Sequence, residues 1–196
     1  AKEEFAEIIV HAIRQIGDEG KIDLNDIKIE KSKGDRIKDT ELISGIVIDK
    51  EKVSHDMPKF VKNAKIALVD FPLEIKNPEI DTKISITSPE QLQSFVIQEE
   101  REIKEMVEKV KLSGASVIFC QKGIDDFAQY LLAKEEIYAC RRVARSDMEK
   151  ISKATGGKIV SNINELSPFE IGNAQIVEEV KHGADAMTYI RGCQNP

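Results

Sequence analysis

Cys120 is the residue of this sequence whose type and position most favour covalent chemistry. It ends an apolar run with strand character, and Gly123, Asp125 and Asp126 follow it at the start of a predicted helix. A thiol beside a helix N-terminus can have a lowered pKa and act as a nucleophile. The two aspartates oppose this by placing negative charge in the first turn, and no histidine lies nearby in the sequence. A small α/β enzyme with Cys120 as its nucleophile is therefore the alternative function, and packing of a buried thiol is the simpler interpretation.

Phosphate and metal motifs have less support. The run TGGK at residues 155–158 has Ser152 and Ile159 where a phosphate-binding loop requires glycine and a serine or threonine. A helix C-cap explains these glycines better. The acidic run at residues 23–26 lacks the glycine and the closing glutamate of a calcium loop, and none of the three histidines has a ligand spacing. Apart from the alternative that uses Cys120, the sequence thus predicts no catalytic residue, no metal site and no cofactor in this chain.

Composition limits the classes of partner. The chain has 196 residues, 41% of them hydrophobic and 33% charged, with a formal net charge of -6. Acids and bases are interspersed, so the sequence predicts no nucleic-acid partner. Its apolar runs are far shorter than the ~20 residues that a membrane helix needs, so no membrane contact is expected. Three distant cysteines favour reduced thiols and a cytoplasmic location. The ends, without an initiator methionine or a tail, suggest a piece of a longer protein.

Strands and helices alternate along the sequence. Helices are predicted at residues 5–16, 88–113, 124–134 and 146–155, and strands at 27–30, 42–48, 65–71, 80–86, 116–120, 137–140, 158–161 and, as a hairpin, 174–191. Ser88 with Gln91 and Ser146 with Glu149 are expected to form capping boxes. The strand-helix order of the second half predicts a βαβαβ unit, and hence an α/β fold with a parallel sheet.

The helix predicted to begin at Ser88 is unusually long, about 24 residues or ~36 Å. Its first turns carry Leu92, Phe95, Val96 and Ile97, which cover a wider arc than one packing face requires. This pattern favours a projecting arm with an exposed apolar surface.

Short, specific runs extend almost from one end of the chain to the other. They are IKIEK at 27–31, DTELI at 39–43, GIVIDK at 45–50, NAKIAL at 63–68, QKGIDD at 121–126, RRV at 141–143, SDMEK at 146–150 and GCQNP at 192–196. Together they resemble the group II chaperonins, that is, the archaeal thermosome and its eukaryotic cytosolic relatives. The chain departs from the usual family sequence at residues 34–36, at residues 54–56 and at Gln194.

The resemblance implies one subunit of a cytosolic double ring, with equatorial, intermediate and apical domains. Residues 1–35 would be an intermediate-domain strip, residues 36–190 the apical domain, and residues 191–196 the return toward the intermediate domain. A helical protrusion is expected at about residues 71–106. The implied fold is α/β and chaperonin apical-domain-like, with a βαβαβ core, flanking strands and a long helical protrusion.

The same resemblance implies the client-binding and cavity-closing part of an ATP-dependent protein-folding chaperonin. Its partners would be non-native protein clients and sister subunits of the ring. The family's nucleotide-binding and catalytic motifs have no counterpart in this sequence, so ATP and Mg are expected only in the full-length subunit, which would be the ATPase. Hinges are expected near Gly34 and Gly192, where the chain would cross between domains.

Two client-binding surfaces are implied. The residues expected to contact clients are Phe71, Leu73, Leu92, Phe95, Val96 and Ile97 on the protrusion, and Gln129, Tyr130, Ala133 and Lys134 on a helix that faces the ring cavity.

Overall fold

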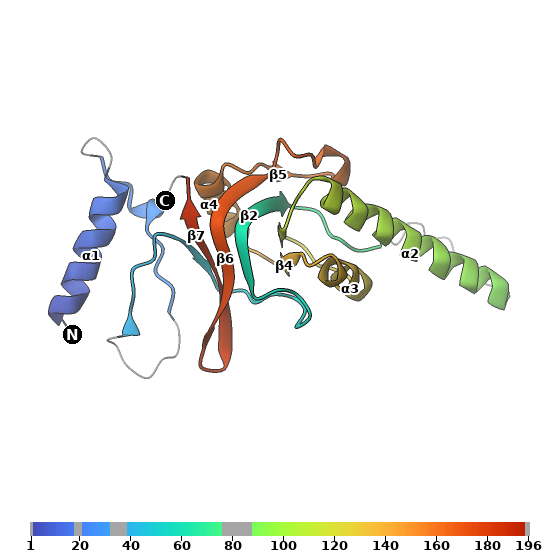
Figure 1. The fold of residues 1–196 in the computed structure, drawn as a ribbon, viewed down its shortest axis with the longest axis horizontal. Helices are drawn as coiled ribbons and strands as arrows, with labels where there is room; N and C mark the ends of the chain where they lie inside the picture. Colours follow the sequence, from blue (N-terminus) through green and yellow to red (C-terminus); the bar gives the residue numbers. More distant parts are fainter. Residues whose placement is uncertain (1, 18–20, 32–38, 76–87, 195–196) are drawn as a thin grey trace.

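The computed structural model describes residues 2–17, 21–31, 39–75 and 88–194. They form a mixed sheet with helices on both faces, and two further helical parts extend from opposite ends (Figure 1). The elements are α1 (Lys2–Ile16), η1 (Leu24–Asp26, a 3-10 helix), β1 (Gly45–Ile48), β2 (Phe60–Val69), α2 (Pro89–Leu112), β3 (Val117–Cys120), α3 (Asp126–Lys134), β4 (Tyr138–Cys140), α4 (Arg145–Thr155), β5 (Ile159–Val160), η3 (Ile163–Glu165, a second 3-10 helix), β6 (Gly172–His182) and β7 (Asp185–Cys193).

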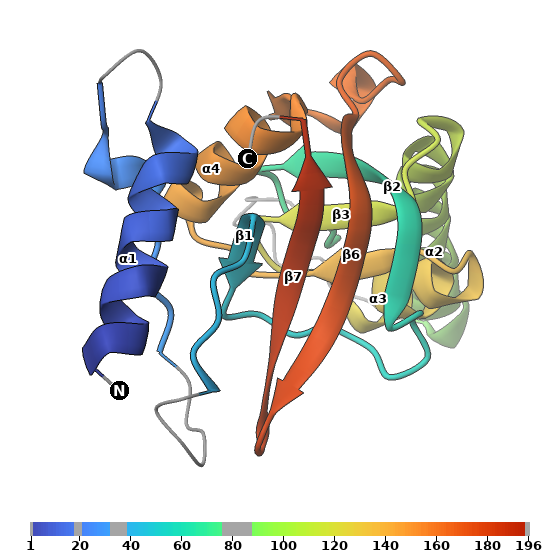
Figure 2. The same cartoon turned by 60° about the vertical axis from the view of Figure 1, so that its left-hand side comes forward.

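Strand β2 joins two differently built halves of the sheet (Figure 2). On one side, β6, β7 and β1 follow one another as antiparallel neighbours. On the other, β3 and β4 are parallel to β2, and β5 pairs in parallel with the end of β2. The order β3-α3-β4-α4-β5 confirms the predicted βαβαβ unit. Because parallel strands end at one edge of a sheet, the loops that follow β2, β3, β4 and β5 meet there.

Each face of the sheet carries its own hydrophobic core. Side chains alternate along a strand, so Ala67 and Val69 of β2 point to one face while Ile66 and Leu68 point to the other. The first face is covered by α2 and α3, and the second by α4. A sheet that is buried on both faces needs continuous apolar strands, which explains the uninterrupted run at residues 66–69.

Several strand predictions need correction. Residues 27–30 form no strand with any described part of the chain, and Ile29 is 80% exposed. Strand β1 is shorter than the predicted 42–48, because only its last four residues pair with β7. Strand β2 begins five residues earlier than predicted, at Phe60, because its first half pairs with β6. The strand predicted at 80–86 lies outside the described residues.

The helix predictions agree more closely. Ser88 caps α2 by accepting a hydrogen bond from Gln91 N at 3.3 Å, and Gly156 ends α4 with a left-handed φ of 76°. The capping box predicted for Ser146 is wrong. Helix α4 begins one residue earlier, after Ala144, which has no side chain that could cap it.

Ion pairs hold the N-terminal segment against helix α4, and a hydrogen bond joins it to strand β1. Lys28 Nζ lies 2.7 Å from Asp147 Oδ1 of α4 and 3.2 Å from the Val47 carbonyl oxygen of β1. Lys153 Nζ lies 2.7 Å from Asp26 Oδ1. Burial lowers the pKa of Lys28, but hydrogen bonds to Asp147 and Glu30 outweigh this, so the pKa is raised overall. The ammonium therefore stabilises this contact in its charged form.

Replacing Lys28 by methionine, which keeps the apolar stem, should lower the free energy of unfolding by about 1–2 kcal/mol near neutral pH. The folded pKa lies above the unfolded value of 10.5, so the contribution is complete below pH 10.5 and is lost as the pH rises through the folded pKa. Urea unfolding of both proteins at several pH values checks this. A difference in stability that stays constant well above pH 11 would contradict the assignment.

Candidate functional site

The C-terminal half of helix α2 packs in the core, while its N-terminal half, residues 89–102, is largely exposed. We call residues 89–102 the free half of α2. Toward its C-terminus, Ile103, Val107 and Val110 belong to the core that α2 shares with α3. From residue 89 to residue 102 every side chain is exposed except that of Glu99, which is half-buried. The free half extends beyond the end of the sheet (Figure 1). A soluble helix normally buries its apolar side chains, so those on the free half need an explanation.

The free half carries an apolar stripe, defined here as Leu92, Phe95 and Val96, which are 52%, 38% and 45% exposed. At 100° per residue these three lie on the same side of the helix as Ile103 and Val107. The stripe is thus a continuation of the buried face of α2 past the point where the body of the protein ends. Ile97, 58% exposed, lies on another side, about 140° from Leu92. The predicted exposure of these four residues is confirmed, while a role in client binding stays a prediction.

Helix α3 packs beside α2 and presents aromatic side chains. The rings of Phe127 and Tyr130 stack with centroids 6.4 Å apart, and Lys104 Nζ of α2 lies 5.8 Å from the centre of the Phe127 ring. Asp125 caps α3 by accepting a hydrogen bond from Phe127 N at 3.2 Å. Lys111 of α2 forms an ion pair with Glu135 at 2.9 Å, so the two helices are held together at that end. The Lys104–Phe127 contact has no signal in the sequence, because only the packing of the helices brings these residues together.

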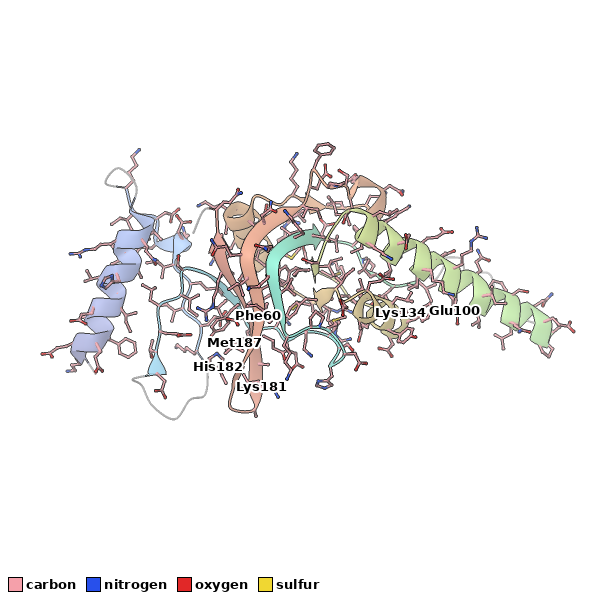
Figure 3. All side chains as sticks on the ribbon, viewed as in Figure 1. Phe60, Glu100, Lys134, Lys181, His182 and Met187 are labelled. Carbon is pink, nitrogen blue, oxygen red and sulfur yellow. The ribbon has the colours of Figure 1, made fainter. Side chains whose placement is uncertain are left out.

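The four residues of α3 that were predicted to contact clients differ in their exposure. Tyr130 and Lys134 are exposed, with Tyr130 at 59%, and Figure 3 labels Lys134 near the end of α3. Gln129 is half-buried and donates from Nε2 to the Ile124 carbonyl oxygen at 2.8 Å, so it ties α3 to the loop that precedes it. Ala133 is half-buried against the core. Tyr130 and Lys134 are therefore the two that are largely exposed.

The structure contradicts the prediction that the Leu73 side chain contacts clients. Its side chain is 0% exposed and lies in the core beneath α2 and α3. Its backbone N donates to the Gly123 carbonyl oxygen at 3.0 Å, and its carbonyl oxygen accepts from Asp125 N at 2.9 Å. These bonds draw residue 73 onto the loop before α3 and turn its side chain inward, so it cannot touch a client. Phe71 is half-buried and packs against the same core.

Of the two predicted hinge residues, Gly34 lies outside the described residues. Gly192 lies inside β7 with a left-handed φ of 65°, and a Cβ built there would come within 2.6 Å of the Gln175 side chain. Strand β7 stays paired with β6 as far as Cys193, so the predicted boundary at residues 190–191 falls within a strand. A hinge at Gly192 stays a prediction.

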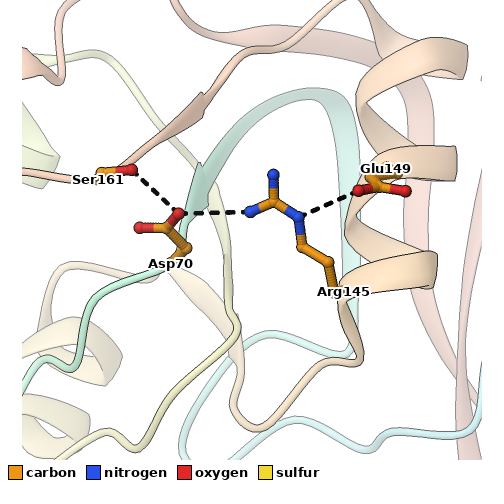
Figure 4. Close-up of polar contacts among 4 residues, drawn as sticks. All are labelled: Asp70, Arg145, Glu149 and Ser161. Atoms are coloured by element: carbon orange, nitrogen blue, oxygen red, sulfur yellow. Dashed lines mark hydrogen bonds and ion pairs between the residues drawn. The ribbon is translucent and has the colours of Figure 1, made fainter.

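Polar side chains meet where the parallel strands end (Figure 4). Asp70 directly follows β2, and its Oδ2 accepts from Ser161 Oγ at 3.0 Å and lies 3.3 Å from Arg145 Nη1. Arg145 Nε also donates to Glu149 Oε1 at 3.1 Å. The carboxylates are occupied by these contacts, and Arg145 is about half exposed. The cluster ties the start of α4 to the ends of β2 and β5, which is a structural role.

Cys120 does not have the environment of a nucleophile. Its side chain is 0% exposed, its thiol donates to the Phe71 carbonyl oxygen at 3.2 Å, and burial raises its pKa to about 11. A catalytic thiol needs access and a lowered pKa, so the interpretation of Cys120 as a nucleophile is wrong. Burial likewise raises the pKa of Cys140 to about 12. Both thiols are core side chains.

Iodoacetamide should therefore label the native chain at Cys193, which is half-buried, and leave Cys120 and Cys140 unmodified. Peptide mapping by mass spectrometry, with and without denaturant, checks which of the three cysteines are labelled. Full labelling of all three thiols in denaturant is the control that every site is chemically competent. Labelling of Cys120 in the native chain as fast as in denaturant would contradict its burial.

The remaining motifs are structural. Thr155, from the run that resembled a phosphate loop, is buried and donates from Oγ1 to the Ile151 carbonyl oxygen at 2.7 Å. Over the described ranges, no three histidine, cysteine or acidic side chains are grouped so that they could hold a metal ion. Nor does the described part contain a helix with the length and apolar character needed to cross a membrane. The surface formed by α2 and α3 is the candidate site that these observations leave.

Comparison with known proteins gives one consistent result. The model of the TCP-1/cpn60 chaperonin family matches residues 1–196. A thermosome subunit of Methanocaldococcus jannaschii is 53% identical over 198 residues, which is 100% of this chain. The thermosome subunit alpha of Thermoplasma acidophilum is 53% identical over 196 residues, or 98% of this chain. The chain spans 36% of the length of each of these relatives.

A solved structure agrees with the sequence matches. The open-state monomer of a group II chaperonin from Methanococcoides burtonii has a TM-score of 0.80 and 41% sequence identity to this chain. The likeness covers 99% of this chain and 43% of that one. The resemblance identified from the short runs is therefore confirmed. The chain belongs to the TCP-1/cpn60 chaperonin family, whose thermosome and group II members it resembles along its whole length.

Proposed function

We propose that this chain is the client-binding and cavity-closing part of an ATP-dependent protein-folding chaperonin subunit. The observation that carries the proposal is the apolar stripe of Leu92, Phe95 and Val96, exposed on a helix that projects from the body. Burying apolar surface contributes about 25 cal/mol per Å², whatever the sequence that supplies it. An exposed stripe of this kind favours apolar segments that folded proteins hide.

The domain assignment belongs to the same proposal. Residues 36–190 are the apical domain, residues 1–35 and 191–196 are strips of the intermediate domain, and the free half of α2 lies in the helical protrusion. The Lys28 and Lys153 ion pairs would then cross between the two domains. Clients would also meet the exposed Tyr130 and Lys134 of α3.

In the full-length subunit, ATP and Mg bind in another domain, and hydrolysis moves this one. Hinges near Gly34 and Gly192 let the domain rotate, so that the protrusions of sister subunits close over the cavity. Client segments held on α2 are released into the cavity when the protrusions move. This chain supplies contact surface and no catalytic residue to that cycle.

Light scattering of a chemically denatured test protein, diluted with and without this chain, tests client capture. We expect the chain to slow aggregation without ATP, and we expect most of this effect to be lost when Leu92, Phe95 and Val96 are all changed to serine. All three are exposed, so the fold should tolerate the change.

A matched control changes Leu24, Leu112 and Phe169 to serine, since these are 70%, 70% and 90% exposed but lie off the free half of α2. This variant should suppress aggregation as well as the unaltered chain. Equal loss in both triple variants would mean that any exposed apolar residue suffices, and no suppression by the unaltered chain would overturn client capture by this chain.

A further inference from the structure

Three carboxylates border the apolar stripe of α2. At 100° per residue, Glu99 lies in line with the stripe, one turn beyond Phe95, while Glu100 and Glu102 lie one to two turns beyond Val96, within about 90° of the stripe direction on its two sides. Glu100 and Glu102 are exposed and Glu99 is half-buried. Figure 3 labels Glu100 on the part of α2 that extends beyond the sheet. An extended ligand that covers the stripe and continues one to two turns toward the body therefore approaches all three carboxylates.

These carboxylates have no counter-ion among the described residues. The two basic side chains of α2 nearest in sequence to these carboxylates have other contacts: Arg101 pairs with Glu105 at 3.1 Å, and Lys104 lies over the Phe127 ring of α3. Within residues 89–102 the acids are Glu90 and the three beside the stripe, against one base, Arg101. The free half of α2 is thus apolar on one side and rimmed by negative charge toward the body.

We propose that the apolar stripe selects client segments whose apolar residues are flanked by lysine or arginine. This selectivity rests on the proposed client capture and names its substrate class. Apolar burial supplies affinity that is indifferent to sequence, whereas complementary charge at the rim discriminates between partners. A segment flanked by acidic residues would bring like charges together with Glu99, Glu100 and Glu102, and it would bind less tightly.

Fluorescence anisotropy with two dye-labelled peptides tests the selectivity. Both contain the same short apolar core, flanked on each side by lysines in one peptide and by glutamates in the other. At low ionic strength, the chain should bind the lysine-flanked peptide at least about fivefold more tightly than the glutamate-flanked one, since the contributions of several exposed charge pairs add up. The ratio should fall toward one at about 0.5 M salt, where such pairs are screened.

Two triple variants locate the effect. Changing Glu99, Glu100 and Glu102 to glutamine should abolish most of the preference. Changing Glu90, Glu105 and Glu108 to glutamine removes the same charge from the opposite side of the same helix, and the preference should remain.

The outcomes separate this inference from the function on which it rests. Equal binding of both peptides, or an equal loss of preference in both variants, would overturn the charge selectivity and leave client capture standing. Binding of neither peptide, together with no effect on aggregation, would overturn client capture and the selectivity with it.

Discussion

Replacing Leu73 by alanine is expected to lower the free energy of unfolding by about 2–5 kcal/mol. The side chain is 0% exposed and fills the core between the end of β2 and the helices α2 and α3. Truncation removes buried apolar surface and leaves a cavity, because residue 73 is fixed by backbone bonds to Gly123 and Asp125 and cannot move inward to fill it. Urea unfolding followed by circular dichroism measures the loss.

The matched variant is Leu92→Ala, which makes the same chemical change at a side chain that is 52% exposed. Its unfolding free energy should change by less than about 0.5 kcal/mol, while its suppression of aggregation should weaken. At urea concentrations and temperatures at which it is still folded, the Leu73→Ala variant should suppress aggregation as well as the unaltered chain does. If Leu73→Ala proved as stable as Leu92→Ala, the burial of Leu73 would be contradicted.

The contrast between these two leucines shows how far the sequence alone predicts the site. Leu92 belongs to a long helix, whose period and Ser88 cap are local signals, so its side of the helix could be computed from the sequence. Leu73 follows a strand in an irregular segment, where no period exists. Its inward orientation comes from bonds to residues about fifty positions away, and only the folded chain brings them together.

The distinction between local signals and long-range contacts also explains which other elements the sequence predicts correctly and which it does not. The four described α-helices and the β6–β7 hairpin were predicted, because caps, turns and apolar periods are encoded within a few residues. The length of β2 was not, since Phe60 joins the strand only through pairing with Glu178 of β6. The helix start at Arg145 was also missed. Its side chain contacts Asp70, 75 positions earlier in the sequence, a contact with no local signal.

Removing the free part of α2 should separate client capture from folding completely. Replacing residues 78–97 by a short glycine-serine linker that ends in a capping serine leaves residues 98–112, which include the packed half of the helix. No residue between 89 and 102 belongs to either buried core cluster. We therefore expect a cooperative thermal transition near that of the unaltered chain, and no suppression of aggregation.

This deletion and Leu73→Ala are expected to have opposite effects on stability and on client capture. One variant loses stability and keeps client capture, and the other keeps stability and loses client capture, because the core beneath α3 and the stripe on α2 share a helix but no side chain. Retained suppression in the deletion variant would move the client site to Tyr130 and Lys134 of α3. Loss of the cooperative transition would instead show that the free half of α2 is needed for the fold, and the protrusion assignment would fail.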